Sequence, residues 1–220
     1  LPAGTAPASA RTLAPSLDPV VLYHDGDKDQ SAAIIAWPTG GGAANVRESR
    51  QLEILTQILQ NRVLNKLREK LGQSYSPQAV NDWPLDLDGG GKIMVIAQLK
   101  PEAVPIFFAA ADEIAADLVA NPVTADELNL VTEPLKQQLS RAGTSSAFFM
   151  YLMEGATSDP ARFSAVRTVL SDYTVTTPEA MQALARKYLV RGASWRLAVL
   201  PKGRTLASLP GWAPGAILTR

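Results

Sequence analysis

Hydrophobic residues between positions 46 and 77 repeat with the period of an α-helix. Residues three or four positions apart form one apolar face: Leu52, Leu55, Leu59, Val63, Leu67 and Leu71. This spacing is typical of a helix face that packs on a core. Ile54, Ile58 and Leu64 widen the face. We therefore predict a long helix over residues 50–71 that is the most buried helix of the protein.

A narrow polar stripe follows the opposite side of this helix. Its members are seven, four and seven positions apart, which keeps them nearly in line along the axis: Arg50, Gln57, Asn61 and Arg68. The pattern predicts that the stripe faces solvent while the rest of the helix is covered by protein.

The helix should end in a sharp corner. Gly72 adopts the left-handed conformation of a helix stop without strain, and Ser76 precedes Pro77, which favours an extended backbone. Arg68 and Tyr75 then lie on either side of a helix-to-strand turn. Two long side chains with strong hydrogen-bond donors can converge there.

Short apolar runs predict five strands, at residues 20–24, 31–37, 76–83, 92–99 and 194–200. The run at 31–37 is almost entirely apolar and should be a central strand that Pro38 ends. Pro77 cannot donate to a ladder, so the strand at 76–83 should be an edge strand. Further helices are expected near residues 102–120, 124–139, 160–170 and 178–188. We assign one aromatic-rich cluster to the core: Phe148, Phe149, Tyr151, Leu152 and Met153.

This order of elements indicates an α+β fold with a mainly antiparallel sheet and helices packed on one face. Residues 1–18 are rich in Ala, Pro, Ser and Thr and are interpreted as a linker. Residues 19–200 form the domain, and residues 201–220 are expected to be an irregular tail.

Composition excludes several functional classes. Lysine plus arginine and aspartate plus glutamate both number 21, so no basic surface attracts nucleic acid. No apolar run reaches the roughly 20 residues of a membrane span. Cysteine is absent, which excludes disulfides, thiolate ligands and a cysteine nucleophile. The compartment stays open, although this composition is compatible with an exported, periplasmic location in a bacterium.

The histidine content limits metal chemistry. His24 is the single histidine, whereas a zinc peptidase site takes two histidines and a carboxylate. The chain therefore should hold no metal site or cofactor of its own. A hydrolase that relies on His24 is a remote alternative, since no G-x-S-x-G elbow accompanies it. The triple glycines at 40–42 and 89–91 lack the order of a phosphate-binding loop.

Two segments resemble a known family. LREKLGQSYSP, residues 67–77, resembles the arginine-to-tyrosine segment in the second half of the pitrilysin-like (insulinase) zinc metallopeptidases, and DQSAAIIAWP, residues 29–38, resembles a strand of their repeating domain. The order of elements over residues 19–200 matches the same domain. H-x-x-E-H and its close variants are absent from the sequence. The resemblance thus implies the C-terminal domain that binds no zinc.

What this resemblance implies about function is specific. Arg68 and Tyr75 would stabilise the transition state or orient a peptide substrate. Zinc, its ligands and the general base would come from a zinc-bearing N-terminal half or a partner subunit, and the chain alone would be inactive. The alternative is a catalytically inert structural or interaction module with the same fold.

Overall fold

The computed structural model describes residues 19–71, 76–190 and 192–212. The strands are β1 (Val20–His24), β2 (Ser31–Gly40), β3 (Gln78–Asp82), β4 (Gly89–Leu99) and β5 (Trp195–Pro201). The helices are α1 (Val46–Leu71), α2 (Val104–Ala120), α3 (Ala125–Ala142), α4 (Ser146–Leu152), α5 (Ala161–Thr174) and α6 (Pro178–Tyr188). Short 3₁₀ turns occur at Ala43–Asn45, Pro101–Ala103 and Leu206–Ser208.

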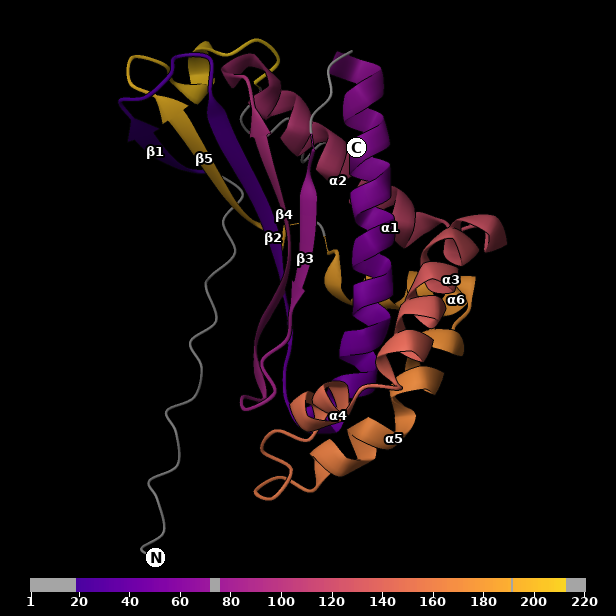
Figure 1. Cartoon of the computed structure of the whole chain (residues 1–220). Coiled ribbons are helices and arrows are strands. Elements are labelled where there is room, and N and C mark those ends of the chain that lie inside the picture. Colours follow the sequence, from indigo (N-terminus) through magenta and orange to yellow (C-terminus); the bar gives the residue numbers. More distant parts are fainter. Residues whose placement is uncertain (1–18, 72–75, 191, 213–220) are drawn as a thin grey trace, which may run out of the picture.

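The strands form one sheet in the order β1-β5-β2-β4-β3. Neighbouring strands are antiparallel except for β1 and β5, which are parallel. The helices lie on one side of the sheet, and no described helix or strand covers the other side (Figure 1). The α+β prediction is confirmed, as are the central position of β2 and the edge position of β3.

Strand β2 extends beyond the residue where we expected it to end. Pro38 pairs with Lys92 of β4, and the strand continues to Gly40 after a shift of register. The pairing of β2 with β5 stops at Ala36 and Trp195. Pro38 therefore lies where β2 has a neighbour on one side only, a position in which a missing backbone donor is tolerated.

Glycines after β2 and at the start of β4 allow a close backbone approach. A Cβ atom on Gly41 would collide with the carbonyl oxygen of Leu87, and one on Gly91 would collide with the carbonyl oxygen of Gly40. The indole nitrogen of Trp83 donates to the carbonyl oxygen of Gly42 at 3.1 Å. The segment is thus packed against the β3–β4 hairpin, because only glycine leaves room for two backbones here.

Helix α1 passes through the centre of the hydrophobic core. It ends at Leu71, as predicted, and buries ten residues along its length: Arg50, Gln51, Leu52, Ile54, Leu55, Thr56, Ile58, Leu59, Val63 and Leu67. Helix α2 buries nine of its 17 residues, a larger share than the ten of 26 in α1. The expectation that α1 is the most buried helix is therefore wrong, because α2 lies between α1, α6 and the sheet.

Arg50 departs from the predicted solvent-facing stripe. Its side chain is 7% exposed and forms an ion pair with Asp172 of α5, with Nη1 at 2.7 Å from Oδ2. The same nitrogen donates to the carbonyl oxygen of Ala165 at 2.8 Å. Thr168 donates to Asp172 at 2.8 Å, and Gln51 donates to the Asp172 backbone. This buried polar cluster attaches α5 to the first half of α1.

The aromatic cluster assigned to the core lies at the surface instead. Helix α4 has no buried residue. Phe148 and Leu152 are half-buried, whereas Phe149, Tyr151 and Met153 are exposed. The apolar composition of this segment was misleading, because α4 is a short helix at the end of the helical layer (Figure 1).

The packed part of the domain extends past residue 200. Leu206 and Leu209, which follow β5, belong to the hydrophobic core. The first part of the expected irregular tail therefore contributes apolar contacts, although it forms only one 3₁₀ turn among the described residues.

Truncation of Leu59 should destabilise the domain. Leu59 is fully buried on α1, so Leu59→Ala should lower the free energy of unfolding by about 2–5 kcal/mol. Asn61→Ala, two residues along at an exposed position, is the control and should change it by less than about 0.5 kcal/mol. Denaturant melts measure both values, and a loss below about 1 kcal/mol for Leu59→Ala would place the core elsewhere.

The buried ion pair should be costly to break from one side. Asp172→Asn leaves the Arg50 charge buried without its counter-ion, and we expect a loss of about 3–5 kcal/mol. The double variant Arg50→Met/Asp172→Leu removes both charges and should lose less than Asp172→Asn alone. Denaturant melts of the wild type, Asp172→Asn and the double variant measure the two losses. Equal losses in both would show that the pair is solvated.

Candidate functional site

The candidate site centres on the last two turns of α1. Arg68 is exposed there, in line with the exposed Asn61. A cation near the C-terminal end of a helix is favoured by the helix dipole. Tyr75 and the preceding residues 72–74 lie outside the described residues, so the predicted convergence of Arg68 and Tyr75 stays a prediction.

Two hydrogen bonds show how β3 runs relative to α1. The amide of Ala79 donates to Oε1 of Gln60 at 2.8 Å, and the side chain of Asn81 donates to the carbonyl oxygen of Ser49 at 2.9 Å. Later residues of β3 thus lie beside earlier residues of α1, so β3 runs antiparallel to α1. Arg68 is within one helical turn of Leu71, the last residue of α1.

The other cations at this end of α1 are neutralised by carboxylates of neighbouring helices. Lys66 lies 2.7 Å from Glu113 of α2, and this hydrogen bond raises the pKa of Lys66 and lowers that of Glu113. Arg62 binds Glu127 of α3 through two nitrogens at 2.6 and 2.7 Å. This hydrogen bonding raises the pKa of Arg62.

Arg68 differs from these cations because it projects from the opposite stripe of the helix. Within residues 19–71, 76–190 and 192–212, its guanidinium makes no hydrogen bond or ion pair. An exposed arginine without such a partner contributes little to folding, and its five donors are available to a ligand.

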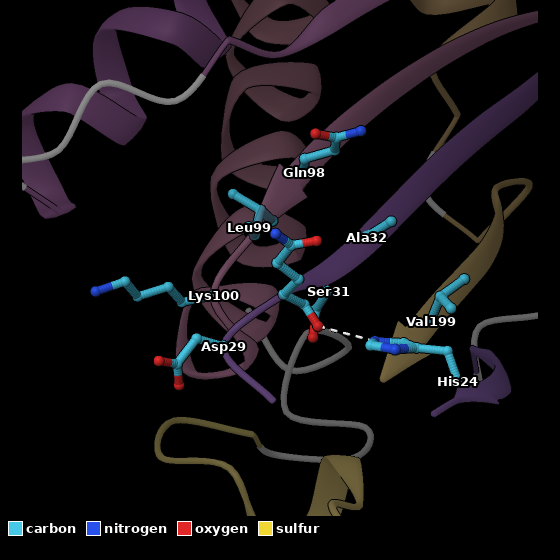
Figure 2. Close-up of a pocket in the computed structure, with 9 residues that line it drawn as sticks. His24, Asp29, Ser31, Ala32, Gln98, Leu99, Lys100 and Val199 are labelled. Atoms are coloured by element: carbon cyan, nitrogen blue, oxygen red, sulfur yellow. Dashed lines mark hydrogen bonds between the residues drawn. The ribbon is translucent and has the colours of Figure 1, made fainter. Parts of the chain in front are cut away.

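A hollow at one end of the sheet contains His24 (Figure 2). It has a volume of about 400 Å³ and is lined by residues of β1, β2, β4 and β5, of the turn after β1 and of the residue after β4: His24, Asp29, Gln30, Ser31, Ala32, Gln98, Leu99, Lys100 and Val199. Nδ1 of His24 accepts a hydrogen bond from the Gly26 amide at 3.0 Å.

Both ring nitrogens of His24 are consequently engaged with the backbone. Because Nδ1 is an acceptor, Nε2 carries the proton and donates to the Gln30 carbonyl oxygen at 2.9 Å. No lone pair is left for a general base in this tautomer. The arrangement favours a role for His24 in holding the β1–β2 turn over the alternative of a hydrolase that relies on it.

The described residues do not fit a zinc ion. No group of three or more histidine, cysteine, aspartate or glutamate residues with suitable placement occurs in the described part of the chain. Across the same residues, no helix has the length and apolar character needed to cross a membrane.

Comparison with known proteins identifies the family. The family described as peptidase M16 inactive domain matches residues 4–135, more than half of the chain. The protein therefore belongs to this family, the C-terminal inactive domain of the pitrilysin-like peptidases that the two sequence segments resemble. No curated protein sequence matches the chain.

Solved structures share the fold. A peptidase M16 inactive domain from Pseudomonas fluorescens superposes with a TM-score of 0.69 at 19% identity, over 92% of this chain and 48% of that chain. The periplasmic protease PqqL from Escherichia coli has a TM-score of 0.69 at 16% identity, over 92% of this chain and 22% of that chain. A conserved protein from Enterococcus faecalis V583 has a TM-score of 0.69 at 11% identity, over 92% and 46%. The chain thus spans half or less of the length of these neighbours.

Zinc analysis tests the assignment of this domain as the one without metal. After dialysis, the purified chain should retain far less than one zinc per molecule and should not cleave a mixture of fluorogenic peptides, because it offers one histidine and no cysteine. Metal analysis and a fluorescence assay provide the readouts. Stoichiometric zinc together with chelator-sensitive cleavage would contradict the expectation.

Proposed function

We propose that this domain is the non-zinc-binding half of a zinc-dependent endopeptidase. It supplies substrate-binding and oxyanion-stabilising donors to a zinc site on another domain or subunit. The observation that carries the proposal is Arg68, an exposed guanidinium with no bonding partner among the described residues, within one turn of the end of α1 at Leu71. Membership of the inactive-domain family supports the proposal that zinc is bound by another domain or subunit.

The chemistry of peptide hydrolysis explains why such donors are needed. When water adds to a peptide carbonyl, the carbonyl oxygen becomes an anion, and donors placed around it lower the barrier. Arg68 offers a planar fork that is always charged. Tyr75 offers a hydroxyl with a usual pKa of about 10, so it carries its proton at neutral pH. The zinc-bearing partner contributes the metal, its ligands and the general base.

The competing function is a structural or interaction module without chemistry. The side of the sheet away from the helices favours an assembly role, because it carries apolar residues such as Ile34, Ile96 and Leu197 that do not belong to the core. The two functions are compatible with one fold, and they differ in what Arg68 and Tyr75 do. The decisive experiment therefore acts on these two side chains in the complete enzyme.

Substitution of the two donors should reduce turnover and leave the fold intact. In the complete peptidase, Arg68→Ala and Tyr75→Phe should each lower kcat by about 10²–10³-fold, the usual cost of one oxyanion donor. Arg68→Lys should be impaired as well, because a single ammonium does not reproduce the two-pronged guanidinium. Measured kcat/KM and thermal melts on the same samples give both readouts.

Asn61→Ala is the matched control, because Asn61 lies on the same exposed stripe of α1. It should retain wild-type turnover. Full activity in both Arg68→Ala and Tyr75→Phe would remove the catalytic role and leave the structural function. A large loss of melting temperature in Arg68→Ala with unchanged kcat would point the same way.

A further inference from the structure

A second hollow lies on the helical side of the domain, between α2 and the end of α6. Its volume is about 440 Å³, which is within the range of pockets that bind small molecules. We call it the α2–α6 hollow and define it by six of the residues that line it: Trp37, Ala109, Ala116, Val119, Arg186 and Leu189.

The lining of this hollow is mainly apolar. Trp37 and Leu189 are each 2% exposed and belong to the hydrophobic core, which places them at the bottom of the hollow. Ala109 and Ala116 are exposed positions of α2. They are seven residues apart and therefore lie on one face of the helix, and Val119 continues this face. Because alanine is small, this face of α2 leaves room for an apolar group.

The acidic side chains at the hollow are already neutralised. Both carboxylate oxygens of Asp112 accept from Nη2 of Arg196, a buried arginine of β5, at 2.8 and 3.0 Å. Glu113 lies 2.7 Å from Lys66 of α1. Arg186, in contrast, has no carboxylate partner among the residues that the structure describes. The uncompensated charge at the hollow is therefore positive and favours an anion.

The end of α2 fixes Arg186 at the edge of the hollow. Its Nε donates to the carbonyl oxygen of Val119 at 3.1 Å, and Gln182, one turn earlier on α6, donates to the carbonyl oxygen of Ala120 at 2.8 Å. These bonds satisfy carbonyl groups that the end of a helix leaves open. The terminal nitrogens of Arg186 have no partner in the described part of the chain. A guanidinium held in this way can bind a carboxylate with both nitrogens.

We propose that the α2–α6 hollow binds a carboxylate that carries an apolar group. The terminal nitrogens of Arg186 bind the carboxylate, and the apolar group lies over Trp37, against Ala109 and Ala116. A free fatty acid and the C-terminus of a peptide that ends in a large apolar residue share this chemistry. Such a ligand needs neither zinc nor a contact with Arg68, so the inference is independent of the proposed function.

Calorimetric titration with decanoate tests the site in the complete peptidase, after a chelator has removed zinc so that no peptide is cleaved. Decanoate has a carboxylate and a flexible apolar chain. We expect saturable binding of decanoate. Decan-1-ol lacks the charge and should bind at least about tenfold more weakly. Absence of saturable decanoate binding, or equal affinity for the alcohol, would overturn the proposal.

Two substitutions locate the bound decanoate. Arg186→Gln removes the charge and should weaken binding at least about tenfold. Ala116→Phe places a ring in the hollow and should weaken binding by a similar factor of about ten. Both positions are exposed, so both variants should fold, which thermal melts check. Wild-type affinity in either variant would overturn the proposal.

Arg167→Gln is the matched control for the charge. Arg167 is an exposed arginine on α5 that has no ion pair within the described residues, and it does not line the hollow. This variant should bind decanoate with wild-type affinity. A loss equal to that of Arg186→Gln would show that decanoate responds only to the net charge of the protein and would overturn the proposal.

Competition distinguishes the two sources of the ligand. A short peptide that ends in leucine with a free C-terminus should displace decanoate if the natural ligand is a peptide end, whereas the same peptide with an amidated C-terminus should not. Decanoate binding that neither peptide disturbs supports the site with a fatty acid as its ligand. Equal displacement by both peptides would overturn the role of the carboxylate.

Discussion

The arrangement of the domain depends on how α1 is enclosed. In its first half, buried residues occur on every side of the helix, including the side of Arg50 that should have faced solvent. The sheet and α2 contact it through apolar residues, whereas α5 contacts it through the ion pair between Arg50 and Asp172. Nearby, the hydroxyl of Tyr173 donates to Glu53, and burial together with the Glu53 charge raises the pKa of Tyr173. This phenol therefore stays protonated and keeps its role as a donor.

The second half of α1 is enclosed less completely, and this difference creates the candidate site. Helix α5 covers the polar stripe of α1 at Arg50. From about Asn61 onward the stripe is not covered, so Asn61 and Arg68 are exposed to solvent. A helix of 26 residues is about 39 Å long, longer than the 14-residue α5 that covers one end of it. One continuous helix can thus support the core at its beginning and present a charged group at its end.

The sequence predicted the elements whose signals are local. The apolar period of α1, the glycine after Leu71 and the proline before β3 each act within a few residues, so the helix, its end and the edge strand followed directly. Arg50 and Arg68 illustrate what local signals leave undetermined. They occupy equivalent positions on one stripe, and the aspartate that buries Arg50 is 122 positions away. Nothing near either arginine distinguishes the buried one from the exposed one.

The candidate site was found for a different reason. Periodicity placed Arg68 on a polar stripe, and the expected turn at Gly72 and Pro77 placed Tyr75 near it. The role of the two side chains came from resemblance to a peptidase family, and Tyr75 lies outside the described residues. The surface position of α4 could not be predicted from its aromatic content. Apolar side chains also occur at protein surfaces, so an apolar segment does not by itself show that it is buried. Only the absence of a covering layer shows the difference.

The central strands also have more apolar residues than the burial of this domain explains. Their composition indicated that both faces of the sheet are buried, because β2 is apolar on both faces. In this domain the helices cover only one of the two faces. A strand sequence reflects every layer that packs on it, including layers contributed by other domains. Where a domain leaves an apolar face open that its own sequence treats as interior, the excess of apolar residues is evidence for a neighbour.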